Sequence, residues 1–146
     1  MVTYDELAER LAPDLAFLKI LDFINLRAQG GYVQVIQDPD SLTAELMVNR
    51  PITDDERRWL IESGWQPPHP GQPTWLRVAA WPPTSATARE LSFAMVNALR
   101  YFTSADISDI QYDARNYDTW EPIEPRSLST LRRAPDRRPG GGAGNG

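Results

Sequence analysis

The chain has 146 residues, of which 41% are hydrophobic and 24% are charged, and its formal net charge is −5. This length suits one domain with a substantial core. It contains no cysteine and a single histidine, which excludes disulfides, thiol nucleophiles and the usual Cys or His metal sites. No apolar run approaches the roughly 20 residues of a membrane helix, and the acidic start lacks a signal-peptide core, so we expect a soluble cytoplasmic protein.

Charge is distributed unevenly along the chain. The segment after Pro125 holds five arginines and one aspartate, so the residues before it carry a net charge of −9. An acidic body repels nucleic acid and anionic membranes and favours basic or neutral partners. Composition divides the chain into a domain over 1–120 and a disordered Arg-, Pro- and Gly-rich tail over 121–146, whose arginines could still contact RNA or an acidic protein.

Three sequence patterns predict where helices begin. Thr3, Thr53 and Thr87 are each followed three residues later by a glutamate, the spacing of a capping box. We expect a first helix from residue 4 into the teens, bent or split at Pro13. A short second helix is expected over 54–63, closed by Gly64, and a third over 88–102.

Between the first two helices the apolar period changes to two, which predicts strands over 20–28, 32–37 and 42–49. Short turns between them indicate an antiparallel meander. A fourth strand is expected over 74–81, whereas 107–114 fits either a helical turn or an edge strand. The order is helix, three strands, helix, strand, helix, so we predict an α+β fold: an antiparallel sheet with helices packed mainly on one face.

The predicted strands also suggest a binding face. If Leu46 faces the helices, Met47 lies on the other side of its strand, and Tyr32 could share that side. We assign Trp75, Arg77 and Trp81 to the same face. The fourth strand is apolar on both sides, which is unusual for a strand with one solvated face. A loop, a second subunit or a client peptide would cover it, and the Pro-rich segment 65–73 folding back is an equally good alternative.

The third helix has an apolar stripe broad enough to bury against the sheet. Phe93 and Val96 fall outside this stripe, among polar residues, and so predict a contact patch. Together with the sheet face, this patch completes the expected partner-binding set: Tyr32, Met47, Trp75, Arg77, Trp81, Phe93 and Val96.

The sequence contains no strong motif for catalysis or metal binding. The acids at 54–56 suit the first turn of a helix, where they complement its dipole, better than a metal site. Asp106, Asp109 and Asp113 lack the glycine and glutamate of a calcium loop and are better read as a solvated helical face. His69 lies in a proline-rich loop without an evident orienting partner. We therefore expect no catalytic, metal or cofactor site, with a carboxylate-only enzyme as a distant alternative.

Several residues carry a resemblance to a known family. Gly64, Trp65, Pro67 and Pro68 follow the second helix, Trp75 and Arg77 form a Trp-x-Arg pattern, and Leu99-Arg100 lies near the end of the third helix. Upstream, residues 32–35 and 42–46 look like the second and third strands of the family. From Thr3 to about Ala114 the chain resembles actinobacterial TY-Chap domains, relatives of the YbjN-like and class I type III secretion chaperone fold.

The resemblance implies a non-enzymatic chaperone-like module, often a homodimer, that holds a partner polypeptide. Class I chaperones of this fold wrap an unfolded client segment over exposed apolar surface, in part by strand addition. The chain departs from the family in its Arg- and Gly-rich end, and no residue identifies a client or a role in secretion. The alternative is a scaffold subunit of a conflict-response or phage-related complex that contacts its partners through the basic tail.

Overall fold

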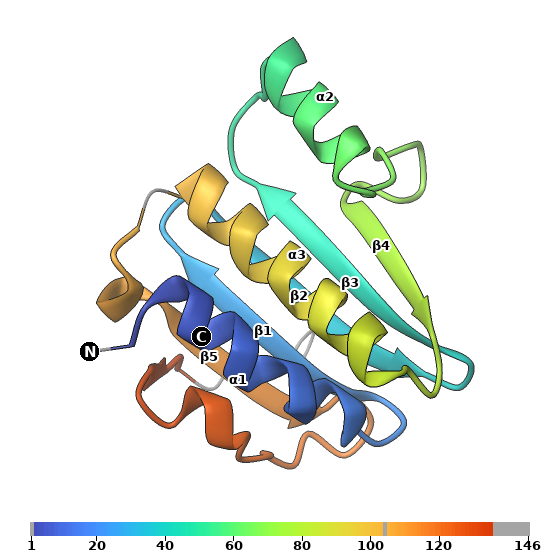
Figure 1. Cartoon of the computed structure of the whole chain (residues 1–146), viewed down its shortest axis with the longest axis vertical. Helices are drawn as coiled ribbons and strands as arrows, with labels where there is room; N and C mark the ends of the chain where they lie inside the picture. The colour runs from blue at the N-terminus through green and yellow to red at the C-terminus, as the bar shows by residue number, and fades with distance from the viewer. Residues whose placement is uncertain (1, 104, 136–146) are drawn as a thin grey trace, which may run out of the picture.

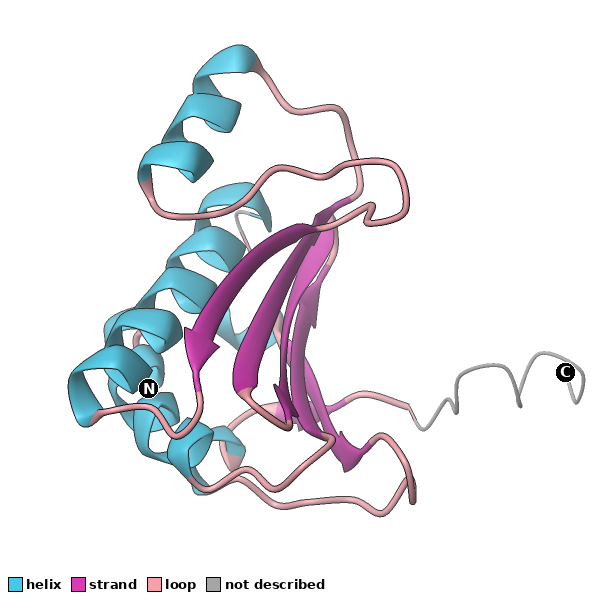
Figure 2. Ribbon diagram, turned by 90° about the vertical axis from the view of Figure 1, so that its right-hand side faces the viewer, coloured by secondary structure: helices cyan, strands magenta, loops and turns pink. Residues whose placement is uncertain are grey.

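The computed structural model describes residues 2–103 and 105–135. Its elements follow in the order α1 (Tyr4–Ala16), β1 (Asp22–Ala28), β2 (Gly31–Asp38), β3 (Ser41–Val48), α2 (Asp54–Glu62), β4 (Trp75–Ala80), α3 (Ser85–Thr103), η1 (Ile107–Asp109), β5 (Gln111–Asn116), η2 (Arg126–Leu128) and β6 (Arg132–Arg133). The helices lie on one side of a single sheet (Figure 2). The predicted α+β class and the order of its first seven elements are confirmed.

The sheet has the order β4-β3-β2-β1-β5-β6 (Figure 1). β1, β2 and β3 form the expected antiparallel meander, β4 pairs with β3, and β5 returns to pair with β1. For residues 107–114 the sequence fitted either a helical turn or an edge strand. The structure contains both, because η1 is a helical turn and β5 follows it. Among the strands that the structure describes, only β6 is parallel to its neighbour.

The core lies between one face of the sheet and the helices α1 and α3. Side chains of β2 alternate strictly between buried and half-buried positions, as expected for a strand with one packed face. Val33 and Val35 of this strand face the helices together with Leu46 of β3. We call this side of the sheet the inner face and the other side, which no helix covers in Figure 2, the outer face.

Two of the three predicted helix starts are confirmed. The Thr3 hydroxyl accepts a hydrogen bond from the Glu6 amide at 3.1 Å, and Thr53 with Glu56 forms a complete capping box. The third prediction was wrong, because the Thr84 hydroxyl accepts from the Thr87 amide at 3.1 Å and α3 starts at Ser85. α1 continues through Pro13 without splitting.

Residues 121–135 pack on the domain, although the sequence predicted a tail from residue 121. The Ile123 amide donates to the Ala114 carbonyl at 3.0 Å and the Ala134 amide to the Tyr112 carbonyl at 2.7 Å, so this segment pairs with the outer edge of β5. Leu128 is fully buried, next to α1. Composition suggested disorder because these contacts are tertiary and leave little local signal. The rest of the predicted tail, 136–146, lies outside the described residues.

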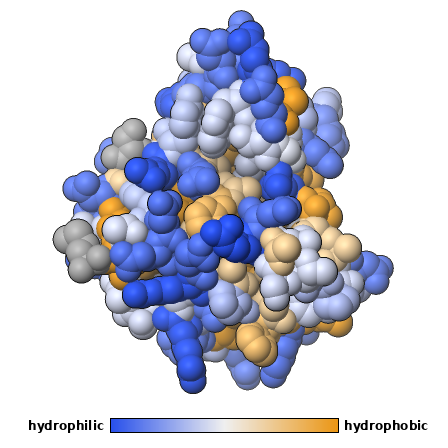
Figure 3. Space-filling model, in the orientation of Figure 1, coloured by the Kyte–Doolittle hydropathy of each residue, from blue (hydrophilic) through white to orange (hydrophobic). Residues whose placement is uncertain are grey.

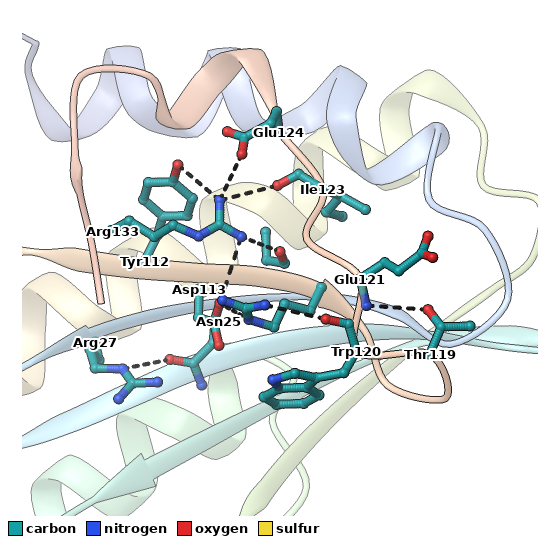
Figure 4. A network of polar contacts seen from close by, with 12 residues as sticks. Asn25, Arg27, Tyr112, Asp113, Thr119, Trp120, Glu121, Ile123, Glu124 and Arg133 are labelled. Atoms are coloured by element: carbon teal, nitrogen blue, oxygen red, sulfur yellow. Dashed lines mark hydrogen bonds and ion pairs between the residues drawn. The ribbon is translucent and has the colours of Figure 1, made fainter. Parts of the chain in front are cut away.

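A polar network fastens this segment to β5 (Figure 4). Arg133 donates to the Ala114 carbonyl at 2.6 Å and to the Glu124 carboxylate at 3.1 Å. Asp113 and Arg115, both almost completely buried, form an ion pair at 3.0 Å. Asp113 is therefore part of a structural ion pair on a strand, and the expected solvated helical face is wrong for this residue.

Candidate functional site

The free edge of β4 is the least protected part of the sheet. At its start, Leu76 exchanges two backbone hydrogen bonds with Gln66, at 2.7 and 3.1 Å. Backbone groups alternate in direction along an antiparallel strand, so Val78 and Ala80 direct their N–H and C=O groups away from β3, as Leu76 does. Within the described part of the chain, these four groups have no hydrogen-bond partner.

A groove of about 500 Å³ runs along this free edge. One wall is β4 from Arg77 to Ala80, the floor is the link through Pro82 and Pro83, and the opposite wall is the start of α3, with Thr87, Glu90 and Leu91. Val78 is 53% exposed at the rim. In Figure 3, apolar side chains reach the surface on the right-hand side, where Figure 1 places β4.

Arg77 lies at the inner end of the groove and is held by the end of α2. Its guanidinium donates to the carbonyl of Ser63, the C-cap residue of α2. Gly64 follows with a φ of +92°, and a Cβ at this position would collide with Arg77 Nη1. Glycine is favoured here by the left-handed conformation that ends the helix, and its missing side chain leaves the space that the guanidinium occupies.

A second groove of about 320 Å³ meets the first at Arg77 and Glu90, which line both. Its walls are aromatic and come from three places: Trp59 on α2, Trp65 after α2 and Phe93 on α3. The two grooves thus form a continuous surface from the free edge of β4 to the junction of α2 and α3. This surface could take up an extended peptide with alternating side chains.

Comparison with protein families gives a match over residues 3–128 to TY-Chap3, described as T3SS (YopN, CesT) and YbjN peptide-binding chaperone 3. The chain belongs to the TY-Chap3 family. The resemblance stated from the sequence is thereby confirmed. No curated protein and no solved structure gives a significant match.

In this TY-Chap3 domain, the predicted outer-face position of three site residues is wrong. β4 pairs with β3 so that Trp75 lies opposite Leu46 and Arg77 opposite Ala44, which places both side chains on the inner face. Trp75 is buried in the core, under the Arg57 guanidinium, and Trp81 packs partly against that core. A shift of one residue in register moves every side chain to the other face, and the apolar pattern of β4 could not fix that register.

The structure also differs from the prediction that Phe93 and Val96 form a contact patch on α3. Val96 is 0% exposed, because α1 packs along α3 and the Ser92 hydroxyl donates to the Ala8 carbonyl at 2.6 Å. It is therefore a core residue and no contact residue. Phe93 is half-buried, lines the aromatic groove and lies under the Arg89 guanidinium, 4.6 Å from its ring centroid. Of the two, only Phe93 lies on a surface that a partner can reach.

Tyr32 and Met47 lie on the outer face as expected, directly opposite each other on β2 and β3. Both are half-buried although no helix covers them. Burial raises the pKa of the Tyr32 hydroxyl, with a smaller contribution from Glu45. Burial also raises the pKa of the Glu45 carboxyl, and Asp38 adds to the effect. This part of the outer face is thus partly shielded from water by its own side chains.

The Pro-rich segment 65–73 does not explain the second apolar face of β4 by folding over it. It runs beside the strand, where Gln66 pairs with Leu76, and closes on itself through a bridge between His69 and Gln72. Its role is to cover the first part of the β4 edge and leave the rest free.

Residues with metal-binding chemistry do not gather in the described part of the chain. Within residues 2–103 and 105–135, no three His, Asp or Glu side chains lie close enough to share an ion. His69 is on the loop after α2, where its Nδ1 lies 2.9 Å from the Pro70 carbonyl. None of the described helices has the length and apolar character that crossing a bilayer requires.

Sequence reasoning missed two features of this site. One is the free edge of β4, whose signal is a short strand followed after one residue by Pro82 and Pro83, which cannot extend a ladder. The other is Glu90, which was assigned to a capping box and instead lines both grooves. α3 starts earlier than predicted because its cap is Thr84, so Glu90 lies further along the helix than the sequence suggested. Only the structure shows this difference.

Proposed function

We propose that this TY-Chap3 domain holds an extended segment of a partner polypeptide against the free edge of β4. The observation that carries the proposal is the row of unpaired backbone groups at Val78 and Ala80, beside a groove of about 500 Å³. An added strand would satisfy all four groups. Such pairing takes its affinity from the main chain and its specificity from alternate side chains.

The family agrees with this assignment, because its members are described as peptide-binding chaperones. In our proposal the domain works without catalysis, since the groove holds one arginine and one glutamate and no nucleophile paired with a base. The net charge of −5 supports a protein client over nucleic acid or an anionic membrane. A cytoplasmic location agrees with a chain that lacks cysteine.

We further propose that two copies associate through the outer face of β2 and β3. Tyr32 and Met47 are half-buried there, and α1 and α3 do not cover them. Met47→Arg should convert a dimer into a folded monomer in light scattering, and Gln29→Arg, which adds the same charge on an exposed turn, should not. A wild-type monomer would refute the dimer and leave the groove proposal intact.

The proposed groove can be tested by removing one backbone donor. Val78→Pro deletes an N–H that points away from β3, so the fold should survive, whereas a paired peptide loses a hydrogen bond. Val78→Ala is the matched control, because it shortens the side chain and keeps the donor. The probe is a fluorescein-labelled nonapeptide of alternating valine and threonine with a central glutamate.

We expect the proline variant to weaken binding of this peptide at least about tenfold and the alanine variant by about threefold or less. In amide spectra of the wild type, the Val78 and Ala80 signals should shift and become protected from exchange on binding. Equal binding by the proline variant and the wild type would exclude the β4 edge as the site.

The alternative role, a scaffold subunit that contacts partners through its basic tail, is weakened by one observation. The Arg133 guanidinium belongs to the network that covers β5 and is already bound to Ala114 and Glu124. Arg126 and Arg132 are exposed. Replacing both with glutamine should leave peptide binding unchanged, and loss of partner assembly in that variant would favour the scaffold.

A further inference from the structure

Arg77 is a cation in the groove without an acidic partner. Within residues 2–103 and 105–135, its hydrogen bonding is limited to the donation from Nη1 to the Ser63 carbonyl, and it forms no ion pair. By contrast, Arg50 is bidentate on Glu56 and Arg89 is bidentate on Glu9. A guanidinium has five N–H donors, so Arg77 retains most of its capacity.

The guanidinium is held in place before any ligand arrives. The Ser63 carbonyl fixes Nη1, and the absence of a side chain at Gly64 leaves the space that the group occupies. The end of α2 also contributes, because the carbonyl end of a helix favours a nearby positive charge. Because the Arg77 guanidinium is already positioned, its side chain loses little conformational freedom when a carboxylate binds.

The register of the sheet determines which side chains of a bound strand reach Arg77. Arg77 and Ala79 point to the inner face, and Leu76, Val78 and Ala80 point to the outer face. A strand paired with Val78 and Ala80 continues this alternation. Because Gln66 already pairs with Leu76, the client side chain that enters the groove next to Arg77 is the inward one opposite Ala79. The others lie next to the exposed Val78.

We infer that the groove selects extended segments with an aspartate or glutamate at an inward position, whose carboxylate pairs with Arg77, and with apolar residues on either side of it. The inference rests on the proposed strand addition at β4 and names the client chemistry. A planar guanidinium matches a carboxylate in a bidentate pair, which is stronger and more directional than a neutral hydrogen bond.

Glu90 opposes this preference. It lines both grooves with Arg77 but is exposed, whereas Arg77 is half-buried. Charges act more strongly where water is excluded, so the attraction to Arg77 exceeds the repulsion from Glu90. The two residues must therefore have opposite effects on an acidic client: loss of Arg77 weakens binding and loss of the Glu90 charge strengthens it.

The test uses three fluorescein-labelled nonapeptides of alternating valine and threonine, with a central glutamate, glutamine or lysine. On the wild-type protein we expect the glutamate peptide to bind about tenfold more tightly than the glutamine peptide and the lysine peptide to bind most weakly. Raising the salt concentration should reduce this difference. The change is made in the peptide, so folding of the protein does not affect the result.

Protein variants then assign the preference to Arg77. Arg77→Gln should reduce the difference between the glutamate and glutamine peptides to about twofold or less, and Glu90→Gln should tighten the glutamate peptide about two- to threefold. Arg77→Lys keeps the charge and loses the fork, so it should retain part of the preference. Thermal unfolding checks that each variant is folded.

Two outcomes separate the inference from the proposed function. If all three peptides bind the wild type equally and protect the Val78 amide, the acidic preference is wrong and strand addition stands. If none of them binds, strand addition at β4 is refuted together with the preference.

Discussion

At one edge of the sheet β5 is covered by residues 121–134, whereas at the other edge β4 leaves Val78 and Ala80 without a partner. The covered edge is closed twice, by backbone pairing and by the network of Asp113, Arg115 and Arg133. Proteins generally protect sheet edges, because an exposed row of N–H and C=O groups invites pairing with other chains. The contrast within one sheet supports the proposal that the domain uses the free β4 edge for binding.

The largest expected effect concerns the ion pair at the covered edge. Asp113→Ala removes the buried carboxylate that pairs with Arg115 and Arg133, and such a change should lower the free energy of unfolding by about 3–5 kcal/mol. Urea unfolding measures the loss. Asp118→Ala, in the exposed turn after β5, serves as the control and should be nearly neutral. A small loss at Asp113 would mean that the network does not stabilise this edge.

The next effect concerns the segment that covers β5. Leu128 is fully buried, so Leu128→Ala should cost about 2–5 kcal/mol through lost apolar contact and the cavity left behind. Thr130→Ala, two residues away and exposed, is the matched control. If 121–135 behaved as the disordered tail that composition suggested, the two variants would be equally stable.

Amide exchange compares the two edges directly. The Asn116 amide on β5 donates to the Glu121 carbonyl at 2.9 Å and should be protected. The Val78 amide occupies the equivalent outward position on β4 and should exchange orders of magnitude faster, close to the rate of an unstructured chain. The Ala79 amide, which faces β3, is the internal control and should be slow. Strong protection at Val78 in the free protein would mean that the edge is already occupied.

The smallest expected effects are changes in the pH dependence of stability caused by Glu45 and Glu56. Burial raises the pKa of Glu45, which lies opposite Leu76 beside the open edge. A raised folded-state pKa means that the stabilisation is complete at low pH and is lost as the pH rises through that value. Glu45→Gln should therefore be slightly more stable than the wild type at pH 7, with the difference vanishing in acid.

Glu56 should behave in the opposite way. Hydrogen bonds from the Arg50 side chain and the Thr53 backbone lower its pKa from 4.5 to about 2. Its contribution is therefore complete above the unfolded value and is lost as the pH falls towards 2. Glu56→Gln should be less stable than the wild type at pH 7, and the gap should close in acid. Urea unfolding at several pH values measures both variants, and the same sign for both would contradict these assignments.

Local signals predicted much of this fold. The capping residues Thr3 and Thr53 predicted the starts of two helices. The alternation of apolar and polar residues along β2 and β3 predicted which side chains face the core. These elements carry their information within a few residues. The antiparallel meander followed from the short turns between the strands.

The site could be predicted only in part, for two physical reasons. β4 is apolar on both sides, so its alternation carries no information on which face is inward, and only pairing with β3 places Trp75 and Arg77. The apolar surface of α3 is wider than one stripe because α1 covers a second side, and this buries Val96. Arg77 was assigned to the wrong face of the sheet and still lines both grooves, and Phe93, assigned to a contact patch on α3, lines the second groove.

In the proposed complex, the pairing of Gln66 with Leu76 would limit how long a client remains bound. It occupies the start of the β4 edge, so a client strand finds only the two groups of Val78 and the two of Ala80. Four backbone hydrogen bonds and a few side-chain contacts give a short residence time, because differences in affinity between related complexes arise mostly from dissociation. If the proposed strand addition holds, such a domain would exchange its clients spontaneously, without an energy source to release them.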